Sequence, residues 1–346
     1  MSEKKGVSNL LHFLVVSTGG TIASGEGREG LTPTMTGHDL LKYVPSLSQL
    51  GEIDVHDLLF KDSSNMSPLD WKRIAMFLIA QEKRYDAFII LHGTDTMAYT
   101  ASALSFMIAN FTKPVVITGS MQPITQPNTD AIDNIYSSFL FAAAMIRLRQ
   151  RGITIAFGGQ LIHGPRSQKI LSHDYTAFTS INYPHLGHIE KGEAILTHRP
   201  SLLTPLFHQK EYETFELETS VFLLTLFPGF RARYLEYIVN MEPKAIVIEA
   251  LGLGGVPHLG ESLLPPLKLS QDLGIPVVIT TQCVYGGVDL NVYEVGRKTL
   301  KMGVISGKDM TREAIITKLM LLLPYVEPYN VEKWLHTNFC DEITLP

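Results

Sequence analysis

Short apolar segments alternate with helical patterns along the first half of this chain, and this alternation restricts the possible folds more than any other feature. The apolar segments are rich in Val, Ile, Leu and Phe, which is typical of strands covered on both faces. Strands that alternate with helices predict an α/β fold with a mainly parallel, doubly wound sheet. The expected strands are residues 10–16, 54–60, 87–91, 114–118 and 153–157, and the expected helices begin at Pro68, follow Asp95, and cover roughly 131–149.

The pattern changes after about residue 190. Residues 197–218 contain two prolines and several threonines without clear periodicity, and we interpret them as a linker. A second α/β unit follows, with strands expected at 221–225, 245–249, 276–280 and 303–305 and helices at about 232–239, 263–273, 311–323 and 331–339. We therefore expect a larger N-terminal domain (1–196), a linker (197–218) and a smaller C-terminal α/β domain (219–346).

Charge and cysteine content exclude several classes of protein. The 29 basic and 34 acidic residues leave a net charge of −5, which argues against nucleic acid or an anionic membrane as the main partner. No apolar run approaches the ~18 residues that span a bilayer. Lys4 and Lys5 precede an apolar run as in a signal peptide, but no typical cleavage site follows. The two cysteines imply no disulfide framework and favour a cytoplasmic protein, and no His/Cys metal spacing occurs at the expected strand ends.

Polar residues follow each of the five expected strands of the first domain. Because the carboxyl ends of parallel strands meet at one edge of a sheet, these residues should converge. A threonine hydroxyl becomes a nucleophile when a base activates it, and glycine amides can bind an oxyanion. Thr21, Thr94, Asp95 and Lys169 form a set of this kind. The structural alternative is that residues 18–20 form a tight turn and that Asp95 stabilises the start of a helix.

Residues 25–30 (Gly-Glu-Gly-Arg-Glu-Gly) match the dinucleotide-binding pattern letter for letter. The pattern requires a preceding strand and a helix that opens at its third glycine. Here the match starts nine residues after the expected strand, no helix pattern follows, and Glu26 and Glu29 would repel a pyrophosphate. We instead expect a mobile loop, which could close over a neighbouring site.

Two of the strand-end segments resemble the signatures of the bacterial-type L-asparaginases, the asparaginase/glutaminase family. Residues 17–24 (Ser-Thr-Gly-Gly-Thr-Ile-Ala-Ser) resemble the first signature and residues 91–97 (Leu-His-Gly-Thr-Asp-Thr-Met) the second. The resemblance covers nearly the whole chain. Residues 92–100 and the lack of a signal peptide resemble the cytoplasmic type I branch more than the periplasmic type II branch.

This resemblance implies hydrolysis of L-asparagine to L-aspartate and ammonia through a β-aspartyl ester, with neither metal nor cofactor. Thr21 would be the nucleophile. Lys169 would tune Thr94, which moves protons or activates water, and Asp95 would also bind the α-ammonium group of the substrate.

The resemblance also implies binding roles for further residues. Ser63 and Ser64 would hold the substrate α-carboxylate, and the backbone around Ser120 would contact the leaving amide. The amides of Gly20 and Thr94 would donate to the oxyanion. Two positions depart from the family pattern: Leu31 stands where many members have a tyrosine that helps to activate the nucleophile, and Asn65 replaces a common aspartate.

Members of the family form dimers or tetramers in which the smaller domain of a neighbour closes the active site. Glu249 and residues 252–255, including Gly254, are the candidates for that contribution, and a strand end with a flexible turn is the alternative. Cys283 lies in a segment that resembles part of an allosteric asparagine site of some type I relatives. A cysteine buried in the core is the alternative there.

Three other functions remain open from the sequence. Glutamine differs from asparagine by one methylene, which is worth only ~1–3 kcal/mol of discrimination, so a glutaminase is the first alternative. The second is the transamidation subunit that frees ammonia for tRNA-bound glutamate. The third is an inactive α/β protein that senses an amino acid or nucleotide.

Overall fold

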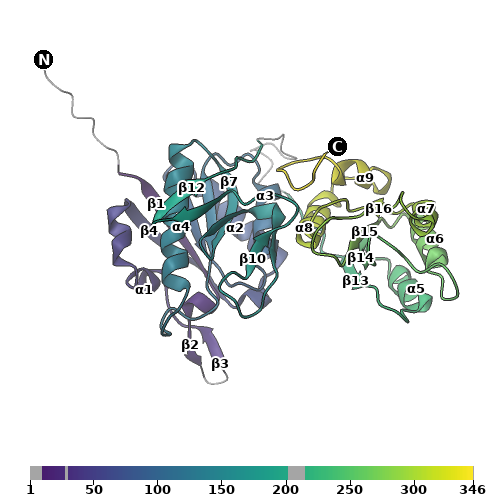
Figure 1. The fold of residues 1–346 in the computed structure, drawn as a ribbon, viewed down its shortest axis with the longest axis horizontal. Helices are drawn as coiled ribbons and strands as arrows, with labels where there is room; N and C mark the ends of the chain where they lie inside the picture. Colours follow the sequence, from purple (N-terminus) through teal and green to yellow (C-terminus); the bar gives the residue numbers. More distant parts are fainter. Residues whose placement is uncertain (1–9, 28–29, 202–214, 346) are drawn as a thin grey trace, which may run out of the picture.

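The computed structural model describes residues 10–27, 30–201 and 215–345. Within these residues the chain forms two α/β units with separate sheets, the larger from the first half of the chain and the smaller from the second (Figure 1). The predicted fold class is confirmed. The domain limits of 1–196, 197–218 and 219–346 stay a prediction, since residues 202–214 of the expected linker lie outside the described residues.

The larger sheet has eight strands in the described part of the chain, in the order β12-β11-β8-β7-β6-β5-β1-β4. The strands from β4 to β7 in this order pair in parallel and correspond to the five expected strands. The expected bounds of β5 and β6 agree with the structure residue for residue. The five are β1 (His12–Gly19), β4 (Glu52–Lys61), β5 (Ala87–Leu91), β6 (Pro114–Thr118) and β7 (Gly152–Phe157).

Helices cover both faces of this sheet, as the doubly wound prediction requires. Alternate residues of β1 point to opposite faces, so that Leu14 and Val16 contact one core and Phe13 and Val15 the other. Helices α2 (Pro68–Gln81) and α3 (Met97–Met107) pack on the first face, and α1 (Gly37–Leu41) and α4 (Ala131–Arg147) on the second.

Beyond β7 the chain turns back into antiparallel strands that the sequence analysis did not predict. Gly158 and Gly159 connect β7 to β8 (Gln160–His163) with φ of +55° and +73°. Two residues with positive φ form the type I′ turn whose twist suits a hairpin. Lys191 and Gly192, with φ of +50° and +81°, connect β11 (Gly187–Glu190) to β12 (Glu193–Leu196) in the same way. The two adjacent glycines after a buried strand were the missed signal.

The expectation of an irregular loop over residues 25–30 was wrong, whereas its mobility stays a prediction. The backbone there forms an antiparallel hairpin of β2 (Ser24–Gly27) and β3 (Gly30–Pro33), which projects from the body of the larger unit (Figure 1). Residues 28–29 at its tip lie outside the described residues, as does the side chain of Leu31. No helix opens at Gly30, so the structural context of a dinucleotide-binding motif is not met.

The smaller sheet is parallel throughout its described strands, in the order β13-β14-β15-β16. Its strands are β13 (Val221–Thr225), β14 (Ala245–Ala250), β15 (Val277–Thr281) and β16 (Ile305–Ser306), and its helices are α5 (Ala232–Asn240), α6 (Leu264–Asp272), α7 (Glu294–Leu300), α8 (Arg312–Leu322) and α9 (Val331–Leu335). Helix α9 is shorter than expected. The buried ammonium group of Lys318 binds the carbonyls of Leu335 and Thr337, which satisfies acceptors at the helix end.

Helix α8 of the smaller unit packs against α3 of the larger one, so that one apolar core runs through both (Figure 1). Among the described residues, no helix combines the length and the apolar character that a membrane crossing requires.

Candidate active site

The turn after β1 brings Thr21 to the carboxyl edge of the larger sheet. Gly20 has a φ of +87°, and a Cβ at this position would lie 2.3 Å from the Cα of Gly93. Only glycine allows the two turns to approach so closely. Thr21 then starts a short 3₁₀-helix (Thr21–Ala23) directly after this contact and is partly exposed to solvent.

The turn after β5 and the short strand β9 (Ser167–Lys169) form a second cluster at this edge. The Nζ of Lys169 donates to the Oγ1 of Thr94 at 2.9 Å and to the Oδ1 of Asp95 at 2.7 Å. Thr94 is buried, whereas the Asp95 side chain is 62% exposed and its carboxylate is open to a ligand. The three residues predicted as one cluster therefore lie within hydrogen-bond distance, although about 75 residues separate Lys169 from the others.

Ser63 connects the turn after β4 to this cluster. Its buried hydroxyl accepts a hydrogen bond from the amide of Asp95 at 3.2 Å, and its carbonyl accepts one from the hydroxyl of Thr96 at 2.8 Å. Ser64 is exposed next to it and donates its hydroxyl to Asp62 at 2.6 Å. The two predicted carboxylate-binding residues thus belong to the same edge as the threonines.

The prediction that the Gly20 amide binds an oxyanion does not fit this geometry. That amide donates to the carbonyl of Lys61 at 2.9 Å. A backbone amide has one proton, so the bond to Lys61 holds the β1 turn in place and leaves no second donor. Gly20 is therefore needed for its backbone conformation and its lack of a side chain, and its N–H is not available to a substrate.

Comparisons with known proteins agree with this arrangement. The family model "Asparaginase, N-terminal" matches residues 12–202, and "Glutaminase/Asparaginase C-terminal domain" matches residues 220–330. The chain belongs to the asparaginase family. The L-asparaginase of Thermococcus kodakarensis is 39% identical, and the match covers 96% of this chain and 99% of that protein. Its solved structure superposes with a TM-score of 0.88, covering 97% of this chain and all of that one.

Two further relatives show the range of the family around this chain. L-asparaginase 1 of Escherichia coli K12 is 35% identical, covering 95% of this chain and 97% of that protein. A glutamyl-tRNA(Gln) amidotransferase subunit of Pyrococcus furiosus is also 35% identical, covering 95% of this chain and 76% of the relative.

Two residues of this chain that the sequence analysis missed, Asp130 and Asn134, hold the turn after β6. Asp130 accepts hydrogen bonds from the amides of Met121 and Gln122 at 2.9 and 3.1 Å, and burial raises the pKa of its carboxyl while these donors oppose the rise. Asn134, one helical turn later in α4, donates to the carbonyl of Gly119 at 3.0 Å. The hydroxyl of Ser120 binds the carbonyl of Gln122 inside this turn. The Ser120 hydroxyl is therefore engaged inside the turn, and the expected contact of the backbone around Ser120 with the leaving amide stays a prediction.

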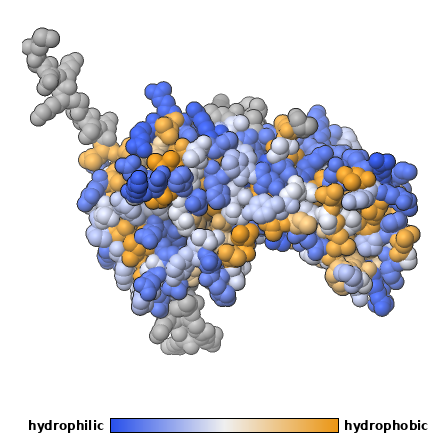
Figure 2. Space-filling model, viewed as in Figure 1, coloured by the Kyte–Doolittle hydropathy of each residue, from blue (hydrophilic) through white to orange (hydrophobic). Residues whose placement is uncertain are grey.

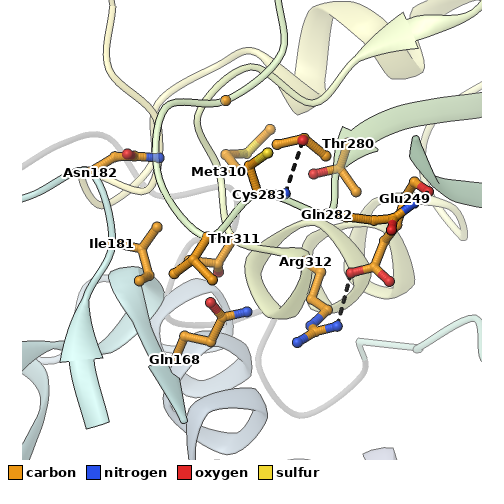
Figure 3. A pocket seen from close by; sticks show the side chains of 13 residues that line it. Gln168, Ile181, Asn182, Glu249, Thr280, Gln282, Cys283, Met310, Thr311 and Arg312 are labelled. Atoms are coloured by element: carbon orange, nitrogen blue, oxygen red, sulfur yellow. Dashed lines mark hydrogen bonds and ion pairs between the residues drawn. The ribbon is translucent and has the colours of Figure 1, made fainter. Parts of the chain in front are cut away.

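Glu249, assigned to a neighbour's site, and Cys283, assigned to regulation, line a cavity of about 60 Å³ between the two units (Figure 3). Glu249 lies at the end of β14, where its carboxylate binds Arg312 at 2.9 Å and Thr225 at 2.5 Å. Cys283 lines the cavity and is exposed, so the alternative of a core cysteine is wrong. Gly254, with φ of +105°, packs near Val288 and Leu290 in an adjacent turn.

His92, directly before the second signature's Gly-Thr-Asp, is buried and stiffens the turn. Its Nδ1 donates to the carbonyl of Gly93 at 2.7 Å, and its Nε2 lies 2.9 Å from the hydroxyl of Thr100, which accepts from the indole of Trp71 at 3.1 Å. Burial lowers the pKa of His92 to about 4. The imidazole is therefore neutral at physiological pH and supports Thr94 through the backbone.

We expect the stability of the protein to fall as the pH decreases from about 6.5 to about 4. Burial also lowers the pKa of His163 to about 4, below the value of about 6.5 in the unfolded chain. Between about pH 6.5 and about pH 4 the unfolded chain binds protons at these histidines and the folded protein does not. His92 and His163 should therefore each lower the free energy of unfolding by roughly 2 kcal/mol as the pH falls from 7 to 5. His163→Gln removes this titrating group and keeps a nitrogen that can donate to the carbonyl of Cys340. In urea unfolding at both pH values, the variant should therefore show a smaller difference in unfolding free energy between pH 7 and pH 5 than the natural protein. An unchanged difference would contradict the prediction.

Proposed function

We propose that this protein hydrolyses L-asparagine to L-aspartate and ammonia, with Thr21 as the nucleophile. The Lys169 ammonium group within hydrogen-bond distance of Thr94 and Asp95, beside the turn that carries Thr21, is the observation that carries the proposal. Full-length similarity to proteins named L-asparaginase supports the choice of substrate. Both the nucleophile and the roles of the cluster belong to the proposal.

The reaction proceeds in two balanced steps. The Oγ1 of Thr21 forms an ester bond with the side-chain carbonyl carbon of asparagine. The C–N bond then breaks, and the nitrogen leaves as ammonia after it takes up the hydroxyl proton. A water molecule next attacks the ester carbon, which releases aspartate and restores the threonine hydroxyl.

The cluster and its surroundings divide the remaining tasks. Lys169 orients and tunes Thr94, which passes protons and activates water. Asp95 binds the substrate α-ammonium group, and Ser63 and Ser64 bind the α-carboxylate. The amide of Thr94 donates to the oxyanion, a role that we no longer assign to Gly20. The scheme uses no metal and no cofactor.

Ammonia release from asparagine and glutamine, measured with purified protein over a wide concentration range, tests the substrate. We expect turnover of asparagine that exceeds turnover of glutamine by a factor of about 10–200, the effect of one methylene in a fitted site. A preference for glutamine would favour the glutaminase alternative. Stabilisation by aspartate without turnover of either amide would favour an inactive sensor.

We further propose that two copies assemble through the C-terminal unit. Apolar side chains are exposed at the carboxyl edge of its sheet, and Figure 2 shows hydrophobic surface on this unit. Apolar side chains exposed together at one edge favour a protein contact, and a second copy fits the oligomers of the family. The exposed residues are Leu251, Leu253, Leu259, Val284, Tyr285, Val292 and Tyr293. Gly254 lies within this edge, whereas Glu249 could reach a neighbour's site only by leaving Arg312.

Light scattering should give a mass of at least two chains, and Leu253→Glu should shift it towards one chain because a charge would enter the contact. The substitution Leu10→Glu, at another exposed leucine outside this edge, is the matched control and should leave the mass unchanged. A monomeric natural protein would rule out the assembly.

Two finer assignments complete the proposal. The two cysteines support a cytoplasmic protein, and the resemblance of residues 92–100 supports the type I branch. The cavity beside Cys283 is proposed as a regulatory asparagine site. A sigmoidal dependence of rate on asparagine in the assay above would support it, and hyperbolic kinetics would argue against it.

A further inference from the structure

Arg166 is a buried guanidinium group that joins the two units next to the active site. It ends the 3₁₀-helix Gly164–Arg166 of the larger unit and is only 1% exposed. Strand β9 follows immediately and ends with Lys169, three residues away. The proposed function uses Lys169 and assigns nothing to Arg166.

The acceptors of Arg166 come from two separate segments of the C-terminal unit. Its Nε donates to the carbonyl of Asp341 at 2.6 Å. Its Nη1 donates to the carboxylate of Asp309 at 2.9 Å, and its Nη2 to the hydroxyl of Thr344 at 3.2 Å. The ring of Tyr183 lies 5.4 Å from the guanidinium carbon. Asp309 precedes α8, whereas Asp341 and Thr344 belong to the chain after α9.

A guanidinium group cannot lose its charge in a protein, so burial makes it depend on its acceptors. If the segment of Asp309 moved away, Arg166 would keep an unpaired charge in the interior; if residues 341–344 moved away, its Nε and Nη2 would lose the acceptors that they have there. The chain before β9 must therefore move with the C-terminal unit, because separating the two would leave a buried guanidinium group without its partners.

Strand β9 packs against helix α3 of the larger unit and has one paired strand among the described residues. It is absent from the eight-stranded sheet and pairs only with β10 (Phe178–Ser180) among the described strands. Its alternate side chains point to opposite sides. Lys169 faces Thr94, whereas Gln168 faces the C-terminal unit, where its amide lies 3.5 Å from Glu313 and close to α8 (Figure 3). The C-terminal unit thus contacts Gln168 in β9 and Arg166 directly before it.

We propose that Arg166 is a positioning residue, through which the C-terminal unit holds Lys169 within reach of Thr94. The inference rests on the proposed role of Lys169 in asparagine hydrolysis. If Arg166 has this role, the active site of a chain is complete only when the segments of Asp309 and residues 341–344 are docked on its own larger unit. This role is separate from a contribution of the C-terminal unit to a neighbour's site.

Arg166→Met, Arg166→Lys and the control Tyr183→Phe test the proposal. The Tyr183 hydroxyl binds the carboxylate of the same Asp341 at 3.0 Å, so its loss loosens the same segment while the Arg166 bonds remain. We expect Arg166→Met to lower kcat for asparagine about 10–100-fold with KM changed less than about threefold, and to alter the pH profile of kcat. Arg166→Lys should recover part of kcat, since a lysine keeps the charge but reaches fewer acceptors. Tyr183→Phe should lower the melting temperature and leave kcat and its pH profile unchanged.

The proposal is overturned if Arg166→Met keeps the natural kcat and pH profile, or if Tyr183→Phe loses kcat in the same proportion to its loss of melting temperature. Thr344→Val serves if Arg166→Met does not fold: it removes one acceptor of Arg166 and the hydroxyl that donates to Asp309, while the Arg166–Asp309 pair can remain. It should lower kcat by a smaller factor, and an unchanged kcat would count against the proposal. Lys169→Met in the same assay distinguishes failure of the proposed function from failure of the proposed role of Arg166. If it is active, the proposed site fails and this inference with it. If it is inactive while the Arg166 variants match Tyr183→Phe, only the role of Arg166 fails.

Discussion

Thr21→Ala is expected to lower kcat for asparagine hydrolysis by at least about 10⁴-fold, because no ester can form without the hydroxyl. The fold should persist, since Thr21 is partly exposed and the close contact of the β1 turn belongs to Gly20. Ammonia release gives the rate. Mass spectrometry of acid-quenched reactions should find one aspartyl group on the natural protein and none on the variant.

Thr21→Ser is the matched control, because it keeps a hydroxyl at the same atom and removes only a methyl group. It should retain measurable turnover and the trapped ester, whereas Thr21→Ala should have neither at an equal melting temperature. Ammonia release by Thr21→Ala at more than about a hundredth of the natural rate would assign the nucleophile to another residue.

Lys169→Met has the second largest expected effect, a loss of about 10³-fold in kcat, within the usual range for a group that supports proton transfer. The substitution keeps the length of the side chain and removes the donor that lies 2.9 Å from Thr94 and 2.7 Å from Asp95. Because the Asp95 side chain is 62% exposed, water can solvate its carboxylate after the change. Thr94→Val should cause a loss of similar size, and the double variant should lose little more than either single one, as expected for residues that act together.

Lys268→Met is the matched control, because it removes a lysine–aspartate ion pair that lies outside the proposed active site. Its Nζ lies 2.6 Å from Asp272 on the exposed surface of α6, and such pairs contribute ~0–1 kcal/mol to stability. We expect its kcat to stay within about twofold of the natural value. Equal and small losses in Lys169→Met and Lys268→Met would show that Lys169 takes no part in the reaction.

Local patterns were sufficient for much of the larger sheet. β5 and β6 are short, fully buried and bounded by polar residues, so their limits in the sequence are their limits in the structure. The convergence of Thr94, Asp95 and Lys169 follows from the rule that parallel strands end at one edge, although Lys169 itself lies on a short strand outside the large sheet. The β2–β3 hairpin was missed because glycine-rich strands carry little alternation.

The sequence by itself determined the fold class, the five parallel strands of the larger sheet and the meeting of Thr94, Asp95 and Lys169, since each follows from hydrophobic periodicity and chain direction over short stretches. Only the tertiary structure decided that the Gly20 amide is taken by Lys61, that Cys283 is exposed and that Arg166 is held by Asp309, Asp341 and Thr344. Those contacts join residues up to 178 positions apart. A single side chain carries no signal of a distant acceptor, because burial and pairing arise only when whole units pack.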